Sequence, residues 1–153
     1  MTNNDILRRI RYLFNYSDLQ MISLFKTANH NVERSLMCNW LKKEEDPLLI
    51  ALTDKELAIF LNGLIIEKRG KSEAPLPEPE DILSNNMILK KLKIALDLKS
   101  DDILDLFDLI NKKISKHELS AFFRKPNHTS YRHCLDQYLR NFLNALQKKY
   151  ENK

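Results

Sequence analysis

Apolar residues recur at helical spacing along most of the chain. Near the N-terminus they stand at positions i, i+1, i+4, i+7 and i+8, which are Ile6, Leu7, Ile10, Leu13 and Phe14. This spacing places the five side chains on one face of an amphipathic helix, and the Asn and Asp residues before it are suitable N-caps. Because no segment shows a sustained alternation with a period of two, the pattern predicts an all-α fold without a sheet.

The same stripe returns 82 positions later, as part of an internal duplication. A gapless shift of this length aligns four identical segments, which are Asn3-Asn4 with Asn85-Asn86, Ile6-Leu7 with Ile88-Leu89, Leu24-Phe25 with Leu106-Phe107, and Phe60-Leu61-Asn62 with Phe142-Leu143-Asn144. Three alternating prolines between the copies disfavour helix and predict an extended linker. The predicted organisation is helical repeat 1 over 1–69, a linker containing Pro and Glu over 70–84, and helical repeat 2 over 85–153.

Each copy predicts a unit of about four helices. The second helix should begin near Ser17-Asp18 and near Ser100-Asp101. The third is predicted over 33–43 and 115–125, where Ser115 and Glu118 have the spacing of a capping box. Thr53 and Glu56 have the same spacing and predict the start of the fourth helix of copy 1. Its counterpart in copy 2 is expected to begin earlier, at Thr129-Ser130.

The second and third helices of each copy together resemble a helix-turn-helix pair. In such pairs one apolar residue closes the turn, another follows five residues later, and a third follows after three more. Val32, Met37 and Trp40 have this spacing in copy 1, and Ile114, Leu119 and Phe122 have it in copy 2. The turn after Thr27 is longer than the usual tight one. Since any short helix pair needs apolar anchors, plain packing stays an alternative interpretation.

Charge is distributed unevenly between the two copies. Residues 1–69 carry ten basic and nine acidic side chains, for a net charge of +1, whereas residues 85–153 carry fourteen and eight, for a net charge of +6. Phe123, Tyr131 and Tyr138 are interleaved with the basic residues, a mixture that suits contact with phosphates and exposed bases. The candidate contacts are Lys116, His117, Arg124, Lys125, Arg132 and Arg140, with Arg8, Arg9, Arg11, Lys90, Lys91 and Lys93 as auxiliary phosphate contacts. A solvated basic face that keeps the protein soluble is the alternative.

Composition limits the class of protein. With 43% apolar and 30% charged residues, two glycines and five prolines, the chain has the composition of a compact globular protein. Its longest apolar runs, such as residues 48–52, are far shorter than the roughly 20 residues that a membrane span needs. The polar N-terminus lacks the apolar stretch of a secretory signal, so we expect a cytoplasmic protein without membrane contact. Cys38 and Cys134 are expected to be structural thiols.

Candidates for catalysis are few, and they cluster near the start of the last helix as His128, His133, Cys134 and Asp136. Neighbouring residues on a helix point about 100° apart, so His133 and Cys134 cannot form a nucleophile–base pair with each other. No two of these residues have the i, i+4 spacing of paired metal ligands, and with two glycines the chain lacks a glycine-rich phosphate loop. We therefore expect no enzymatic activity, no metal site and no cofactor.

Five segments carry a further signal, and they span nearly the whole chain. They are NNDILRRIRY at 3–12, WLKKEEDP at 40–47, FLNGLI at 60–65, ISKHELSAFFRKP at 114–126 and DQYLRNFL at 136–143. These segments resemble the bacterial YehS-like proteins, a family of unknown function in which the domain occurs as two tandem copies. The resemblance implies a bacterial cytosolic protein, and it implies no activity and no site residues.

Two interpretations of the function follow from the sequence. In the first, the repeats bind RNA or DNA, mainly through the basic residues of copy 2. In the second, the protein is a helical adaptor or regulator in which Trp40, Phe122, Phe123 and the proline linker present or border an apolar groove for a protein partner. Because Trp40 and Phe122 occupy equivalent positions of the two copies, core packing is the better prediction for both. The oligomeric state is not specified by the sequence.

Overall fold

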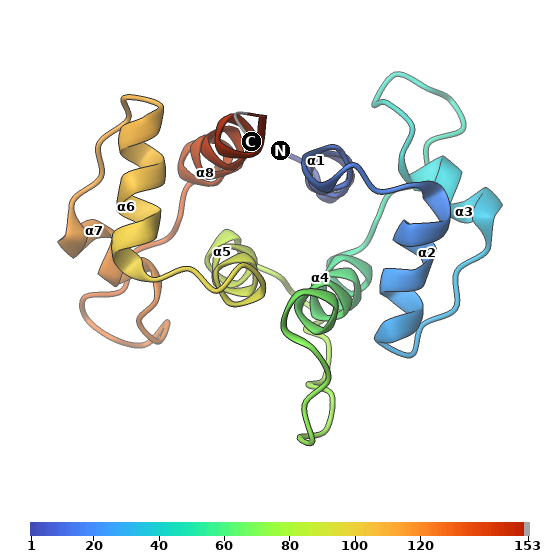
Figure 1. Cartoon of the computed structure of the whole chain (residues 1–153), viewed down its shortest axis with the longest axis horizontal. Helices are drawn as coiled ribbons and strands as arrows, with labels where there is room; N and C mark the ends of the chain where they lie inside the picture. The colour runs from blue at the N-terminus through green and yellow to red at the C-terminus, as the bar shows by residue number, and fades with distance from the viewer. Residues whose placement is uncertain (152–153) are drawn as a thin grey trace. The chain divides into compact units, whose positions relative to one another are not determined.

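The computed structural model describes residues 1–151, and within that range the chain forms eight α-helices and no β-strand (Figure 1). The helices are α1 (Asn3–Phe14), α2 (Asp18–Thr27), α3 (Arg34–Trp40), α4 (Asp54–Arg69), α5 (Asn85–Ala95), α6 (Ser100–Leu109), α7 (Lys116–Phe122) and α8 (Asp136–Glu151). They fall into two compact units, one ending at Leu83 and the other beginning at Ser84. The predicted all-α fold is confirmed. Residues 152–153 of the predicted second repeat lie outside the described residues.

The two units use the same helix packing. In the first, α2 packs against α3 and α4, and α1 packs against α4; in the second, α6 packs against α7 and α8, and α5 packs against α8. Ten residues predicted to be core from the duplication are all at most 4% exposed, and these are Ile6, Leu24, Phe25, Trp40, Phe60, Ile88, Leu106, Phe107, Phe122 and Phe142. Phe25 stands at the centre of the first core, with ring centroids 5.3 Å from Trp40 and 5.4 Å from Phe60.

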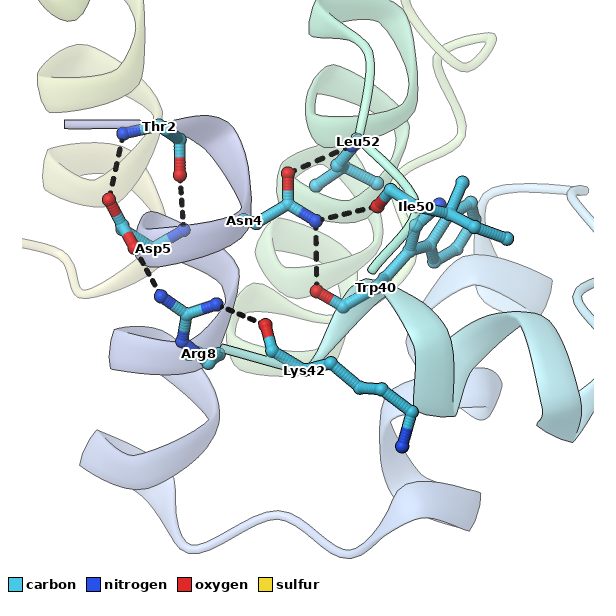
Figure 2. A network of polar contacts seen from close by, with 8 residues as sticks. All are labelled: Thr2, Asn4, Asp5, Arg8, Trp40, Lys42, Ile50 and Leu52. Carbon is cyan, nitrogen blue, oxygen red and sulfur yellow. Dashed lines mark hydrogen bonds and ion pairs between the residues drawn. The ribbon is translucent and has the colours of Figure 1, made fainter. Parts of the chain in front are cut away.

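Most predicted helix starts agree with the structure, and the exceptions are the N-cap of α1 and the start of α8. The capping boxes at Thr53 and Glu56 and at Ser115 and Glu118 are both formed. α1, however, is capped by Thr2 and not by an Asn or Asp. The Thr2 hydroxyl accepts the N–H of Asp5 at 3.0 Å, and the Asp5 carboxylate accepts the N–H of Thr2 at 3.0 Å, which closes a capping box that was not predicted from the sequence (Figure 2).

Asn4 and Asn86 lie inside the first helix of each unit and bind a distant loop. The Asn4 Nδ2 donates to the carbonyls of Trp40 at 2.9 Å and Ile50 at 2.8 Å, while its Oδ1 accepts the N–H of Leu52 at 2.9 Å (Figure 2). Asn86 repeats all three bonds, to the carbonyls of Phe122 and Arg132 at 3.0 and 2.8 Å and from the N–H of Cys134 at 2.9 Å. We call each set of three bonds an asparagine clamp. It satisfies buried backbone groups where the chain has left the helix.

The asparagine clamps explain where the third and fourth helices differ from the prediction. α3 and α7 end at Trp40 and Phe122, three residues earlier than predicted, because the carbonyl of each last residue is taken by the clamp. The prediction that the last helix begins at Thr129-Ser130 is wrong, since α8 begins at Asp136. Asn86 holds the backbone of Arg132 and Cys134, so the chain passes through turns at 126–130 and reaches α8 over residues 131–135, which have no regular secondary structure.

The side chains of Asn3 and Asn85 bind the end of the same two loops and the first residue of the helix that follows each loop. The Asn3 Nδ2 donates to the carbonyl of Leu52 at 3.1 Å and to the Asp54 carboxylate at 2.7 Å. The Asn85 Nδ2 makes the equivalent bonds, at 2.9 Å and 2.7 Å, to Cys134 and Asp136. Loop 41–53 and loop 123–135, which join the third helix to the fourth, are therefore each anchored at both ends.

The helix pairs keep the predicted apolar anchors but have long connections. Residues 28–33 join α2 to α3, and residues 110–115 join α6 to α7. Asn29 and Asn111 stand at equivalent positions of these connections with φ values of 62° and 58°, which is the left-handed region that Asn tolerates better than most residues. The anchors at Val32, Met37, Ile114 and Leu119 are all buried.

Gly63 lets two helices of the first unit approach closely. A Cβ atom built on Gly63 would lie 1.9 Å from the carbonyl oxygen of Leu24, so the α4 backbone meets the α2 backbone directly. The equivalent residue of α8 is Ala145, which is fully buried with its methyl group in place. The α2–α4 pair therefore requires a glycine at a position where the α6–α8 pair accepts a larger residue.

The segment after α4 runs without helix to the second unit. Its end is attached to the start of α4, because the N–H of Leu83 donates to the Asp54 carboxylate at 2.9 Å and Lys55 lies 3.9 Å from Asp81. None of the helices described between residues 1 and 151 combines the length and the apolar character needed to cross a membrane.

Candidate functional site

The second unit contains a pocket of about 760 Å³ between α7, loop 123–135 and the start of α8. Its lining comes from His117, Glu118, Ala121 and Phe122 of α7, from residues 129–133 of the loop, and from Leu135 and Tyr138. The loop wall is held in place by the clamp of Asn86 and by the N–H of Arg132, which donates to the Ala121 carbonyl at 3.3 Å. The pocket falls in the size range of about 300–1,000 Å³ that is typical of ligand sites.

Two aromatic pairs line this pocket. Tyr131 and His133 of the loop meet edge to face, with ring centroids 5.2 Å apart and an interplanar angle of 82°. Phe122 and Tyr138 form a second edge-to-face pair at 5.2 Å. Phe122 belongs to the core, Tyr131 and Tyr138 are half-buried, and His133 is exposed. The pocket therefore offers ring surface to a ligand from the loop side and from the α8 side.

Glu118 and Tyr138 supply polar groups to the same pocket. The Tyr138 hydroxyl donates to the Glu118 carboxylate at 3.2 Å. The N–H of Ser115 donates to that carboxylate too, and this bond is the main reason why the pKa of Glu118 lies below its usual value. Partial burial, followed by the bond to Glu118, raises the pKa of Tyr138. At neutral pH the pocket thus holds a carboxylate acceptor beside a protonated phenol.

The structure brings two of the six predicted contact residues into the pocket. His117 and Arg132 line it, from α7 and from the loop. Lys116, Arg124 and Lys125 are exposed at the two ends of α7 and lie outside the lining. Arg140 is half-buried on α8, and its guanidinium donates to the Gln137 side chain at 3.0 Å. Lys116, Arg124, Lys125 and Arg140 therefore lie on the elements that form the pocket without lining it.

The auxiliary residues of copy 1 are largely engaged in their own fold. Arg8 pairs with Asp5 and donates to the Lys42 carbonyl at 2.6 Å (Figure 2). Arg11 lies 2.8 Å from Asp18 and donates to the Tyr16 carbonyl at 3.1 Å. These contacts brace α1 against the residues that follow it, so we leave Arg8 and Arg11 out of the proposed interface, and Arg9 is left out because it is half-buried.

The auxiliary lysines of copy 2 have different environments. Lys90 is exposed, whereas Lys91 is only 8% exposed. The Lys93 Nζ lies 5.6 Å from the centroid of the Phe123 ring, within reach of a cation–π contact. Lys90 alone has the accessibility of an ordinary surface cation.

Cys134 and the nearby histidines have structural surroundings. Burial, together with the charge of Asp136, raises the pKa of the Cys134 thiol to about 12, so it is not a thiolate nucleophile at neutral pH. The His128 Nδ1 accepts the N–H of Ser130 at 2.9 Å within the loop. Among residues 1–151, no three His, Cys, Asp or Glu side chains converge in a way that would hold a metal ion.

The matching surface of the first unit is apolar. At the loop positions equivalent to residues 129–133, copy 1 has Pro47-Leu48-Leu49-Ile50-Ala51, and Leu48 and Ile50 are 62% and 42% exposed. Sequence reasoning missed both the pocket and this apolar surface, because it weighed the basic and aromatic residues without comparing the two loops. The 82-residue alignment contained the signal, since Thr-Ser-Tyr-Arg-His in one copy replaces Pro-Leu-Leu-Ile-Ala in the other.

Comparison with known proteins agrees with the duplication. The model of a family described as "Protein of unknown function (DUF1456)" matches twice, over residues 3–70 and 85–151. The chain is 42% identical to a protein of Escherichia coli (strain K12) described as "Uncharacterized protein YehS", over 147 residues that cover 95% of this chain and 94% of that protein. No solved structure matches. The chain therefore belongs to the DUF1456 family of proteins of unknown function, and it carries that family's domain as two tandem copies.

Proposed function

We propose that the protein is a non-enzymatic, cytosolic nucleic-acid-binding protein whose second repeat contacts phosphates. The observation that carries the proposal is a difference in how the cations of the two repeats are paired. In the first repeat Arg8 pairs with Asp5, and Arg11 and Arg34 both reach Asp18. In the second, the side chains of four exposed cations have no acidic partner among the described residues, and these are Lys116, Arg124, Lys125 and Arg132.

Unpaired cations favour a polyanionic ligand for a thermodynamic reason. A cation already held by a carboxylate must lose that partner before it binds a phosphate, whereas a solvated cation exchanges only water and weakly held ions. Each phosphate that is neutralised releases condensed counterions, which supplies most of the affinity of non-specific complexes. The net charge of +6 over 85–153, against +1 over 1–69, adds long-range attraction to the second repeat.

A salt titration of oligonucleotide binding tests the proposal. We expect log affinity to fall linearly with log salt concentration, with a slope of about −0.7 to −0.9 per phosphate neutralised. Arg124→Gln together with Lys125→Gln should weaken binding to every sequence and flatten the slope by about two contacts. The matched control is Lys42→Gln with Lys43→Gln, because these lysines occupy the equivalent positions of the first repeat. Neither Lys42 nor Lys43 has an acidic partner among the described residues, so pairing does not separate the two double variants; we expect the control pair to have the smaller effect because the first repeat carries a net charge of only +1.

The proposal fails if the wild-type chain binds RNA and DNA no more tightly than about 10⁻⁴ M at low salt, the weak end of non-specific association. It also fails if the two double variants lose affinity equally. In either case the second candidate gains, which is a protein-binding adaptor. That function is favoured by Leu48 and Ile50, two exposed aliphatic residues within five positions of loop 41–53, since exposed apolar residues that gather in one place mark contact surfaces more often than scattered ones do.

A further inference from the structure

We propose that the pocket of the second repeat receives one unpaired base of a single-stranded nucleic acid, and that this repeat consequently prefers single strands over duplexes. The inference rests on the proposed function, because it names the class of nucleic acid that the same basic surface takes. It depends on the ring surface of the pocket, on the polar groups within it, and on the charge of the neighbouring helix α6.

The rings are placed where a base can reach them. Tyr131 and His133 come from the loop, and their edge-to-face contact covers only one of the four ring faces in the pair. A pocket of about 760 Å³ leaves room for a base against the remaining surface. Stacking of unpaired bases on aromatic side chains is the common mode of binding for single strands, and it tolerates any sequence because every base has a π-face.

Polar groups stand at the positions that such a complex requires. Arg132 is the neighbour of Tyr131 and His133, so its guanidinium is available to the phosphate attached to a stacked base. Glu118 offers a carboxylate acceptor, and Tyr138 offers a hydroxyl next to it. An unpaired base exposes donors and acceptors on its Watson–Crick edge, which a duplex keeps hidden. The lining therefore combines the three kinds of contact that a single nucleotide offers.

The negative charge of α6 disfavours the docking of a duplex. In a helix-turn-helix complex the second helix enters the major groove while the first crosses the phosphate backbone. Here the first helix is acidic, because Asp101, Asp105 and Asp108 are all exposed on α6 and the helix contains no Lys or Arg. Phosphates crossing α6 would meet like charge. A single strand that follows loop 123–135 and the ends of α7 avoids this helix.

The test compares single strands with a duplex on the full chain. The probes are labelled oligonucleotides of about twelve nucleotides, within the roughly 4–16 that single-strand sites cover, as single-stranded RNA, single-stranded DNA and duplex DNA at one low salt concentration. We expect the wild-type chain to bind a single strand more tightly than the duplex. Tyr131→Ala should weaken single-strand binding by about 5- to 150-fold, the equivalent of one lost stacking contact, and leave the weaker duplex binding unchanged.

Two further variants serve as controls for the effect of Tyr131→Ala. Tyr131→Phe keeps the ring and should keep the preference, and unchanged duplex binding by Tyr131→Ala shows that this variant is folded. Leu49→Ala removes the residue at the equivalent position of loop 41–53 and should change neither affinity. Equal binding of single strands and duplex, with no effect of Tyr131→Ala, overturns the base pocket but leaves phosphate binding by the second repeat standing. No binding of any probe by the wild-type chain overturns both.

Discussion

Replacing Asn4 by alanine removes the asparagine clamp of the first unit and should destabilise that unit by about 3–5 kcal/mol. Three hydrogen bonds disappear, and each is worth about 0.5–1.5 kcal/mol net. The lost partners include the N–H of Leu52 and the carbonyl of Trp40, both in buried residues, and a buried backbone group left without a partner adds about 1–3 kcal/mol. The better helix propensity of alanine offsets at most about 0.7 kcal/mol.

The assay uses the only tryptophan of the chain. Trp40 is buried in the first unit, so its fluorescence during urea unfolding reports on that unit, whereas far-ultraviolet circular dichroism reports on the helices of both. Asn4→Ala should move the fluorescence transition to lower urea, since the expected loss is a large part of the about 5–15 kcal/mol that stabilises an ordinary domain. The control Asn31→Ala makes the same chemical change at an exposed residue that makes no hydrogen bond to the described chain.

A loss of less than about 1 kcal/mol for Asn4→Ala, the value of a single ordinary hydrogen bond, would show that the clamp does not stabilise the first unit in this way. The same conclusion holds if Asn31→Ala costs as much as Asn4→Ala, because the loss would then not arise from the clamp.

The close packing and the buried thiol give two further predictions. Gly63→Ala should destabilise the first unit by about 1–3 kcal/mol, as overpacking does, because the new methyl group would lie 1.9 Å from the Leu24 carbonyl oxygen. Ala145→Gly should cost the second unit only about 1 kcal/mol of helix propensity; urea unfolding of both variants measures this, and a stabilising Gly63→Ala would contradict it. Since folding raises the pKa of Cys134 from 9.0 to about 12, the folded chain prefers the protonated thiol. The free energy of unfolding that the protonated thiol contributes should be fully present below pH 9 and should be lost between about pH 9 and 12. Cys134→Ala should remove this part of the loss of stability in melts recorded at different pH values.

The sequence predicts the elements well where the information is local. Capping boxes such as Thr53 with Glu56 involve residues three apart, and the buried faces follow from helical periodicity, so both were accessible without a structure. Asn4 shows the limit. Its repetition as Asn86 was visible, but its partners lie 36 to 48 residues away, and only the folded chain brings them to it. A local interpretation as an N-cap was therefore wrong.

The sequence predicted basic residues of the candidate site but did not predict its pocket. His117 was named as a contact from its outward position on the predicted third helix and Arg132 from its charge, and both line the pocket. The pocket could not be derived, because one of its walls is formed by non-helical residues 129–133, and the expected helix start at Thr129-Ser130 would have made this wall the first turn of a helix. The prediction that the last helix begins at Thr129-Ser130 and the failure to predict the pocket therefore have the same cause.

The chemistry of the clamps has a consequence for how the two copies diverge. Asn4 and Asn86 hold their loops through carbonyl and N–H groups only, and every amino acid except proline offers both. The residues between the anchor points can therefore be exchanged without loss of the fixing bonds. Each loop behaves as a cassette, and after the duplication one cassette became aliphatic while the other became aromatic and basic. A single chain could in this way acquire two specificities while its scaffold stayed the same.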